Sequence, residues 1–154
     1  MSHARKTIRN AVATILKTSP STWSSVSESR IQSKMQIWPY LMVFSESESS
    51  GTSTVLNPTV YEKEVILSIV GLLRLPGTGD TQTIEDKMDA MAAEIETKLT
   101  QTTLRAAVSQ IQNIEIIATK MDVILEEDGV DHAELNQTWK ISYSTLEGLP
   151  ETPV

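Results

Sequence analysis

The sequence VILSIVGLLRLPGTGD, residues 65–80, joins a long apolar run to a turn that contains two glycines. Successive side chains of a strand point to opposite faces, and one face of residues 60–75 is almost wholly apolar from Val65 onward. The segment therefore predicts a long strand, mostly central in its sheet, with helices covering its better face. Gly71 interrupts the apolar run and suggests a bulge or a bend.

The same order of strand, glycine turn and helix occurs in phosphate-binding loops. Here the turn has no third glycine at the required spacing and no Lys-Ser/Thr pair. The carboxylates of Asp80, Glu85 and Asp86 would also repel a phosphate. We interpret the turn as a corner that folds the following helix back onto the strand.

Two segments carry the periodicity of amphipathic helices. In residues 3–17, apolar side chains recur every three or four positions and form one stripe, and Pro20 ends the pattern. Residues 83–99 repeat Ile, Met and Leu in the same way, with two carboxylates in the first turn that complement the helix dipole.

Strand patterns account for most of the remaining chain. A short strand is expected near residues 26–31, and another at residues 40–45 directly after a proline. Residues 112–129 and 132–145 contain two more strands, joined by an Asp-Gly turn signal. We therefore expect an α+β fold, with a mainly antiparallel mixed sheet of about four to five strands and two helices packed on one face.

The chain is expected to form a single domain over residues 1–154, because this length suffices to bury one core. Residues 45–59 are rich in Ser, Thr and Glu and predict a long flexible loop, a kind of segment that often carries interactions. The tail at residues 147–154 contains two prolines and is expected to be extended and outside the core.

Composition argues against several classes of function. Hydrophobic and charged residues, at 40% and 21%, are typical of a globular protein, and the formal net charge of -7 argues against sequence-specific nucleic-acid binding. The chain has no cysteine, which excludes disulfides and thiolate metal sites, and two histidines are too few for an ordinary zinc site. A run of about 18 apolar residues is absent, which argues against a membrane partner. The first residues lack an apolar signal core, so we expect the protein to stay where it is made.

The sequence shows no catalytic constellation. His3 and His132 are interpreted as solvated, and no serine lies in a recognised nucleophile motif. The basic residues near the N-terminus are interpreted as a solvated helix face. An acidic cluster is interpreted as a solvated hairpin tip, since its spacing does not match a calcium loop; its members are Glu126, Glu127, Asp128, Asp131, His132 and Glu134. We therefore expect no enzyme activity, no metal and no cofactor.

The ordered set of segments resembles a known family. An N-terminal helix contains HARKTIRNAV (residues 3–12), and a strand that follows a proline, PYLMVFSESE (39–48), leads into polar sequence. A long strand then precedes a helix that starts with acidic residues, in YEKEVILSIVGLLRLPGTGDTQTIEDKMDAMAAEI (61–95), and the chain closes with AELNQTWKISYST (133–145). This set is similar to the tail terminator proteins of long-tailed (siphovirus-type) bacteriophages, the family of the lambda minor tail protein U.

The resemblance implies a structural role in the virion. Members of this family form a hexameric ring that caps the tail tube, stops its polymerisation and provides the docking surface for the head or connector. The implied partners are other copies of the chain, the major tail tube protein and a head-completion or connector protein, while genome DNA only passes through the channel. The implied location is the head-proximal end of the tail, after assembly in the host cytoplasm. The sequence departs from the lambda member in a longer Ser/Glu-rich loop and a longer tail beyond Thr145.

A heterologous ring contact requires two different, complementary patches on each subunit. We expect the basic side chains of the first helix to meet the acidic hairpin tip of the next subunit, and the polar loop to reach a neighbour or the tube. The expected interface residues are Arg5, Lys6, Arg9, Glu46, Glu48, Ser50, Gly51, Glu126, Glu127, Asp128 and Asp131.

Two alternatives remain open at this stage. The first is a head-tail connector or tail-completion protein of the same virion neck, which would form rings on filled heads rather than on tails. The second is a small-molecule-binding α+β regulatory domain, whose pocket would be lined by the strand at residues 65–75 and the glycine turn. Ligand-dependent thermal shifts across a metabolite panel would support the second alternative.

Overall fold

The computed structural model describes residues 3–31, 37–54, 57–76, 83–125 and 131–154. In these residues the fold is α+β, with a mixed and mostly antiparallel sheet, which confirms the fold class expected from the sequence. The elements are α1 (Ala4–Leu16), β1 (Ser25–Ser27), β2 (Tyr40–Thr54), β3 (Val60–Arg74), α2 (Ile84–Lys98), α3 (Gln101–Ala107), β4 (Asn113–Ile124), β5 (His132–Leu146) and β6 (Leu149–Pro153).

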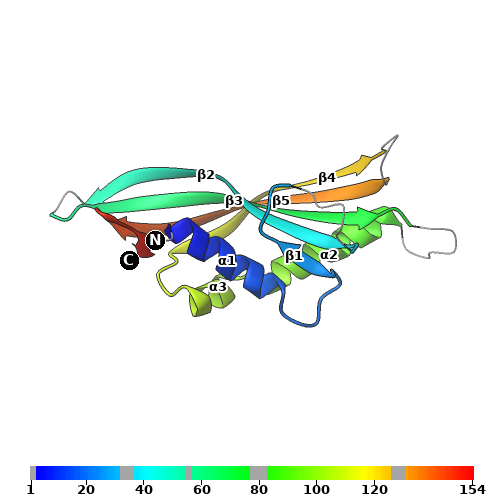
Figure 1. Ribbon diagram of the computed structural model, residues 1–154, viewed down its shortest axis with the longest axis horizontal. Coiled ribbons are helices and arrows are strands. Elements are labelled where there is room, and N and C mark those ends of the chain that lie inside the picture. Colours follow the sequence, from blue (N-terminus) through cyan, green and yellow to red (C-terminus); the bar gives the residue numbers. More distant parts are fainter. Residues whose placement is uncertain (1–2, 32–36, 55–56, 77–82, 126–130) are drawn as a thin grey trace.

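The sheet has the strand order β1-β2-β3-β5-β4, and β6 pairs with β5. Only β1 is parallel to its neighbour, and it covers just three residues of β2. β3 lies in the middle and pairs along its whole length with β5, from Val60 opposite Leu146 to Arg74 opposite His132. Figure 1 shows an elongated molecule whose strands cross in projection because the sheet is twisted.

The larger hydrophobic core joins the helices to the sheet. Buried side chains of α1, α2 and α3 pack with alternate residues of β3 and β5, such as Leu67, Ile69 and Leu135. In Figure 1 α1 and α3 lie below the strands, and α2 overlaps the right-hand end of the sheet. A second cluster, made by Tyr40, Met42, Val70 and Leu72, occupies alternate positions. β3 is therefore packed on both faces, as its continuous apolar run requires.

Gly71 serves close packing rather than a bulge. It pairs in regular register with Leu41 and with Leu135. A Cβ at this position would overlap the Sδ atom of Met91 and lie 3.3 Å from Cδ2 of Leu41. The glycine therefore allows α2 to approach the sheet.

The prediction of a flexible loop at residues 45–59 is wrong for most of this segment. Ser45–Thr54 belongs to β2 and pairs with β3, with register shifts between Ser45 and Ser47 and between Thr52 and Thr54. An edge strand exposed to water needs few apolar residues, so a polar composition does not distinguish such a strand from a loop. Residues 55–56 lie outside the described residues.

Three further elements differ from expectation. The described chain has three helices and six strands. Two of these elements, α3 and β6, were not predicted, and β1 is shorter than expected. α3 begins with a capping box between Thr100 and Thr103. The tail is extended, as expected, but it turns at Gly148, which has a φ of 79°, and pairs with β5 instead of leaving the sheet.

The solvated position expected for His132 is also wrong. Its side chain is buried against the ring of Trp38, at 5.4 Å between ring centroids, and its Nε2 lies 3.1 Å from Oε1 of Glu134. The start of β5 places it on the same face as the second cluster, where Trp38 also packs. The glycine turn at residues 77–80 lies outside the described residues.

Candidate functional site

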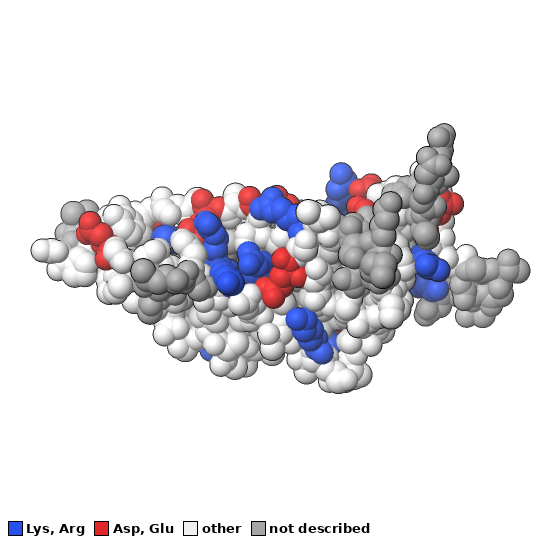
Figure 2. All heavy atoms as spheres, viewed as in Figure 1, with Lys and Arg blue, Asp and Glu red and all other residues white. Residues whose placement is uncertain are grey.

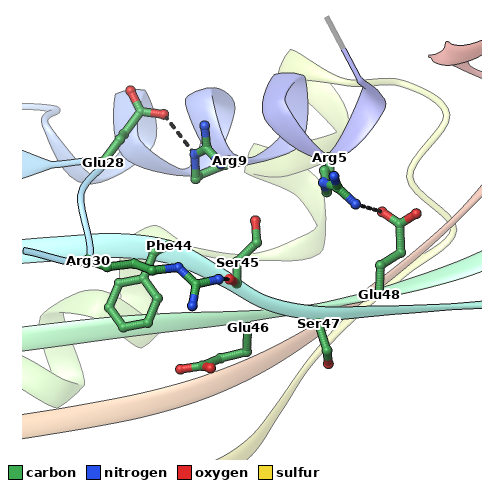
Figure 3. A pocket seen from close by; sticks show the side chains of 9 residues that line it. All are labelled: Arg5, Arg9, Glu28, Arg30, Phe44, Ser45, Glu46, Ser47 and Glu48. Carbon is green, nitrogen blue, oxygen red and sulfur yellow. Dashed lines mark hydrogen bonds and ion pairs between the residues drawn. The ribbon is translucent and has the colours of Figure 1, made fainter.

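A polar pocket lies between the N-terminal half of α1 and the part of β2 that β1 leaves uncovered (Figure 3). Its volume is about 310 Å³. The lining residues are Arg5, Arg9, Glu28, Arg30, Phe44, Ser45, Glu46, Ser47 and Glu48. Three arginines and three glutamates thus surround one small volume.

The helix geometry of α1 places two of the arginines on this wall. His3 is the N-cap, and its Nδ1 accepts a hydrogen bond from the backbone N–H of Arg5 at 3.2 Å. Arg5 and Arg9 are four residues apart, so they lie on one side of the helix. The neighbouring stripe, which includes Ile8 and Val12, is fully buried and fixes the rotation of the helix on the core.

Glu48 connects four elements at the inner end of the pocket. Its carboxylate lies 3.7 Å from Nε2 of His3, 3.9 Å from Nη1 of Arg5 and 3.6 Å from Nζ of Lys63. It also accepts a 2.7 Å hydrogen bond from the hydroxyl of Tyr143. The side chain of Glu48 is only 10% exposed, and such a carboxylate is tolerated because partners surround it.

The tyrosine in this cluster remains neutral at ordinary pH. Tyr143 has no exposed surface, and burial raises its pKa well above the usual value, with the hydrogen bond to Glu48 and the charge of Glu48 adding to the effect. A neutral phenol is the form that donates to a carboxylate. Tyr143 therefore acts as a fixed donor that links β5 to β2 across β3.

At the outer end of the pocket, arginine side chains cover the part of the β2 edge that has no partner strand among the described residues. Nε of Arg9 lies 3.5 Å from Oε1 of Glu28, and Nη2 of Arg30 donates to the backbone oxygen of Ser45. The guanidinium of Arg30 also lies over the ring of Phe44, 5.4 Å from its centroid. Arg30 thus occupies an edge carbonyl just beyond the end of β1, where another strand could otherwise pair.

The charged side chains of this pocket are engaged within the chain. Each arginine has a partner within the chain, and the basic and acidic side chains lie next to each other in the middle of the face seen in Figure 2. Among the described residues, no group of three His, Asp or Glu side chains is arranged to hold a metal ion. The cluster joins α1, β2, β3 and β5.

A second feature lies at the far margin of the sheet. β4 has one strand neighbour, β5, among the described residues, and most of its side chains are exposed. Its large apolar side chains and the residue that follows it have substantial exposed fractions: Ile116 36%, Ile117 52%, Met121 46%, Val123 49% and Leu125 73%. We call these five residues the β4 strip. An exposed apolar edge of this kind is unusual on a protein that works as a monomer.

The sequence-predicted interface residues fall into separate places. Arg5, Arg9, Glu46 and Glu48 come together at the pocket, but within one chain. Lys6 is exposed on α1, and Ser50 and Gly51 are exposed on β2 away from it; Asp131 is exposed just before β5. Glu126, Glu127 and Asp128 lie outside the described residues.

Sequence reasoning missed both the partners in the pocket and the β4 strip. Glu28 and Arg30 line the pocket from the segment that follows β1. Lys63 and Tyr143 reach Glu48 from β3 and β5, and strand pairing brings them near. The i, i+4 spacing of Arg5 and Arg9 was the one local signal of the site. For the β4 strip, the imperfect alternation of residues 113–125 gave an available signal, because apolar residues on both faces imply more than one covered side.

Comparison with known proteins leaves the family undetermined. No protein-family model matches the chain, and no curated protein matches it either. In the part of the chain that the structure describes, no helix is long and apolar enough to span a membrane.

Proposed function

We propose that this chain is a structural subunit of a long-tailed bacteriophage, which assembles with further copies into a ring that caps the tail tube. In this role it stops tube polymerisation and offers the docking surface for the head or connector. The proposed partners are other copies of the chain, the major tail tube protein and a head-completion protein. The proposed location is the head-proximal end of the virion tail.

The observation that carries this proposal is the β4 strip. Its five large apolar side chains are 36–73% exposed on a strand whose outer edge has no partner strand in the described chain. Covering such side chains gains roughly 25 cal/mol for each Å² of apolar surface removed from water. Such a surface is expected on a subunit that functions within an assembly, where a partner covers it, and not on a regulatory domain that functions as a free monomer.

The cluster of His3, Arg5, Lys63 and Tyr143 around Glu48 supports the same role near the opposite edge of the sheet. It anchors the β2–β3 hairpin to α1 and β5, and Figure 1 shows this hairpin extending to the left-hand end of the molecule, past the helices. A supported polar hairpin is suited to contact a neighbouring subunit or the tube. Ser50 and Gly51, which were expected in a mobile contact loop, lie on β2 within this hairpin.

The small-molecule alternative has less support in the geometry. The strand expected to line its pocket is packed on both faces, with Val65, Leu67 and Ile69 in one core and Val70 in the other. The pocket between α1 and β2 is lined in part by arginine and glutamate side chains that pair within the chain.

Electron microscopy of phage particles tests the proposed function. A phage that lacks this gene should produce tails of irregular and excessive length, and the intact gene supplied in trans should restore a uniform length. Normal-length tails without the gene would contradict the proposal. A ring found only on filled heads, and never on purified tails, would favour the connector alternative instead.

A pair of matched variants links the test to the β4 strip. Val123→Lys places a charge on the strip, whereas Ala93→Lys places the same charge at an exposed position of α2. We expect Ala93→Lys to restore uniform tails and Val123→Lys to fail. Equal restoration by both variants would remove the β4 strip from the ring contact.

A further inference from the structure

We propose that the free protein, before it meets a tail, pairs with a second copy through β4, with the two strands antiparallel about a two-fold axis at Met121. The dimer follows from the surface of β4 alone. Its place as a state that precedes the ring rests on the proposed function.

The surface that would pair is the regular half of β4. The register shift against β5 lies between Ile116 and Ala118, and from Ala118 to Ile124 the pairing is uninterrupted. One edge of this segment bonds to β5, and no other strand of the described chain pairs with it. Met121 and Val123 are about half exposed on one face of this segment.

Charge selects one alignment of two such strands. With the axis at Met121, Lys120 of each copy lies opposite Asp122 of the other, so two ion pairs form across the seam. Moving the axis by one residue places Lys120 opposite Lys120 or Asp122 opposite Asp122, and like charges directly opposite each other are destabilising.

These two charged side chains are available for the contact. Their side chains are 77% and 54% exposed, and within one chain Nζ of Lys120 lies 3.8 Å from Oδ2 of Asp122. In contrast, Glu115 at the other end of β4 lies 2.5 Å from Nζ of Lys140 and is engaged with β5. The exposed half of the strand thus carries one charge of each sign, placed symmetrically around Met121.

The same alignment covers the apolar side chains. Thr119 lies opposite Val123 and Ala118 opposite Ile124, while Met121 lies opposite its own copy. A second copy therefore offers β4 opposite charges at Lys120 and Asp122 and an apolar partner at Met121. Because this contact uses the same patch on both copies, it closes as a dimer and does not extend into a ring. The dimer would have to open before β4 could take part in ring assembly.

Cysteine cross-linking tests the register, since the chain has no cysteine of its own. Met121→Cys places two thiols opposite each other, with Cβ atoms roughly 4.5–5.5 Å apart, close to disulfide range. Val123→Cys is the matched control: it lies on the same face with a similar exposure, but its two copies would be about 13 Å apart along the strands. Under mild oxidation, Met121→Cys should give a species of twice the 17.0 kDa chain on a non-reducing gel, and Val123→Cys should not.

A charge exchange tests the selectivity. Lys120→Asp and Asp122→Lys should each weaken the dimer by roughly tenfold, because each places like charges across the seam. The double variant restores both pairs with reversed sign and should recover dimerisation. Both positions are exposed, and circular dichroism verifies that the variants fold.

Three results would overturn the proposed dimer: a light-scattering mass of one chain at the highest soluble concentration, equal cross-linking of both cysteine variants, or no recovery in the double variant. The tail-length experiment is independent of these outcomes. A monomer that still restores uniform tails would remove the dimer and leave the proposed function, whereas a dimer whose gene is dispensable for tail length would do the reverse.

Discussion

Replacing Tyr143 by Phe should change how the stability of the protein depends on alkaline pH. The hydroxyl of Tyr143 is buried and donates to Glu48 at 2.7 Å, and its pKa in the folded state is raised above the ordinary value. Below a pH of about 10, the tyrosine of the unfolded chain is also neutral, so the full stabilisation is present. Above that pH the unfolded chain ionises and the folded chain does not, so stability is lost as the pH rises.

The size of this effect follows from linkage. Losing a hydrogen bond to a charged acceptor costs about 1.5–3 kcal/mol, so Tyr143→Phe should lower the free energy of unfolding by this amount at pH 7. Between pH 9 and pH 11, ionisation of an ordinary tyrosine stabilises the unfolded wild-type chain by about 1.4 kcal/mol. The difference between wild type and variant should shrink by the same amount over that interval.

Urea denaturation at several pH values measures both quantities. Taking the difference between the two proteins cancels the other groups that titrate in this range, among them Lys140, whose pKa is raised by its bond to Glu115. A difference that stays constant from pH 9 to pH 11 would refute the claim that Tyr143 is a buried neutral donor to Glu48.

Two further predictions concern the packing that supports the site, both measured by denaturation. Gly71→Ala should cost about 1–3 kcal/mol, because the new methyl group overlaps Met91, and combining it with Met91→Ala should cost less than the sum of the single changes; strict additivity would show that the two residues do not touch. Thr100→Ala should cost about 1 kcal/mol through loss of the capping box of α3, while Thr102→Ala at the neighbouring exposed position should cost less than about 0.5 kcal/mol; similar losses at both positions would contradict the capping role.

Hydrophobic periodicity was sufficient to predict the main elements of the fold. The apolar stripe of residues 3–17 corresponds to α1, and the Ile and Met pattern of residues 83–99 corresponds to α2. The strand predicted over residues 60–75 corresponds to β3. These segments bury a face, so burial leaves a periodic trace in the sequence.

The elements that were missed are those whose sequence lacks a hydrophobic periodicity. The second half of β2 is held by backbone pairing at an exposed edge, so serines and glutamates there resembled a loop. β6 is short and lies on β5 after a glycine turn, and α3 spans only Gln101–Ala107. Such segments depend on tertiary pairing more than on local preference.

The candidate site was predictable only in part. The grouping of Arg5 and Arg9 on one helix face follows from their spacing, and both lie at the pocket. Glu48, the partner of Arg5, was expected on a mobile loop that reaches a neighbouring subunit or the tube. The β2–β3 pairing instead fixes Glu48 against α1 and Tyr143, a long-range contact that no local pattern encodes.

Growth of tail tubes in the presence of the purified chain tests the central claim most directly. Tube protein that is polymerising should stop elongating when the chain is added, and electron microscopy should show a ring of its copies at one end of each tube. Tubes that continue to lengthen at the same rate, with ends free of added protein, would contradict the proposed role as a tail terminator.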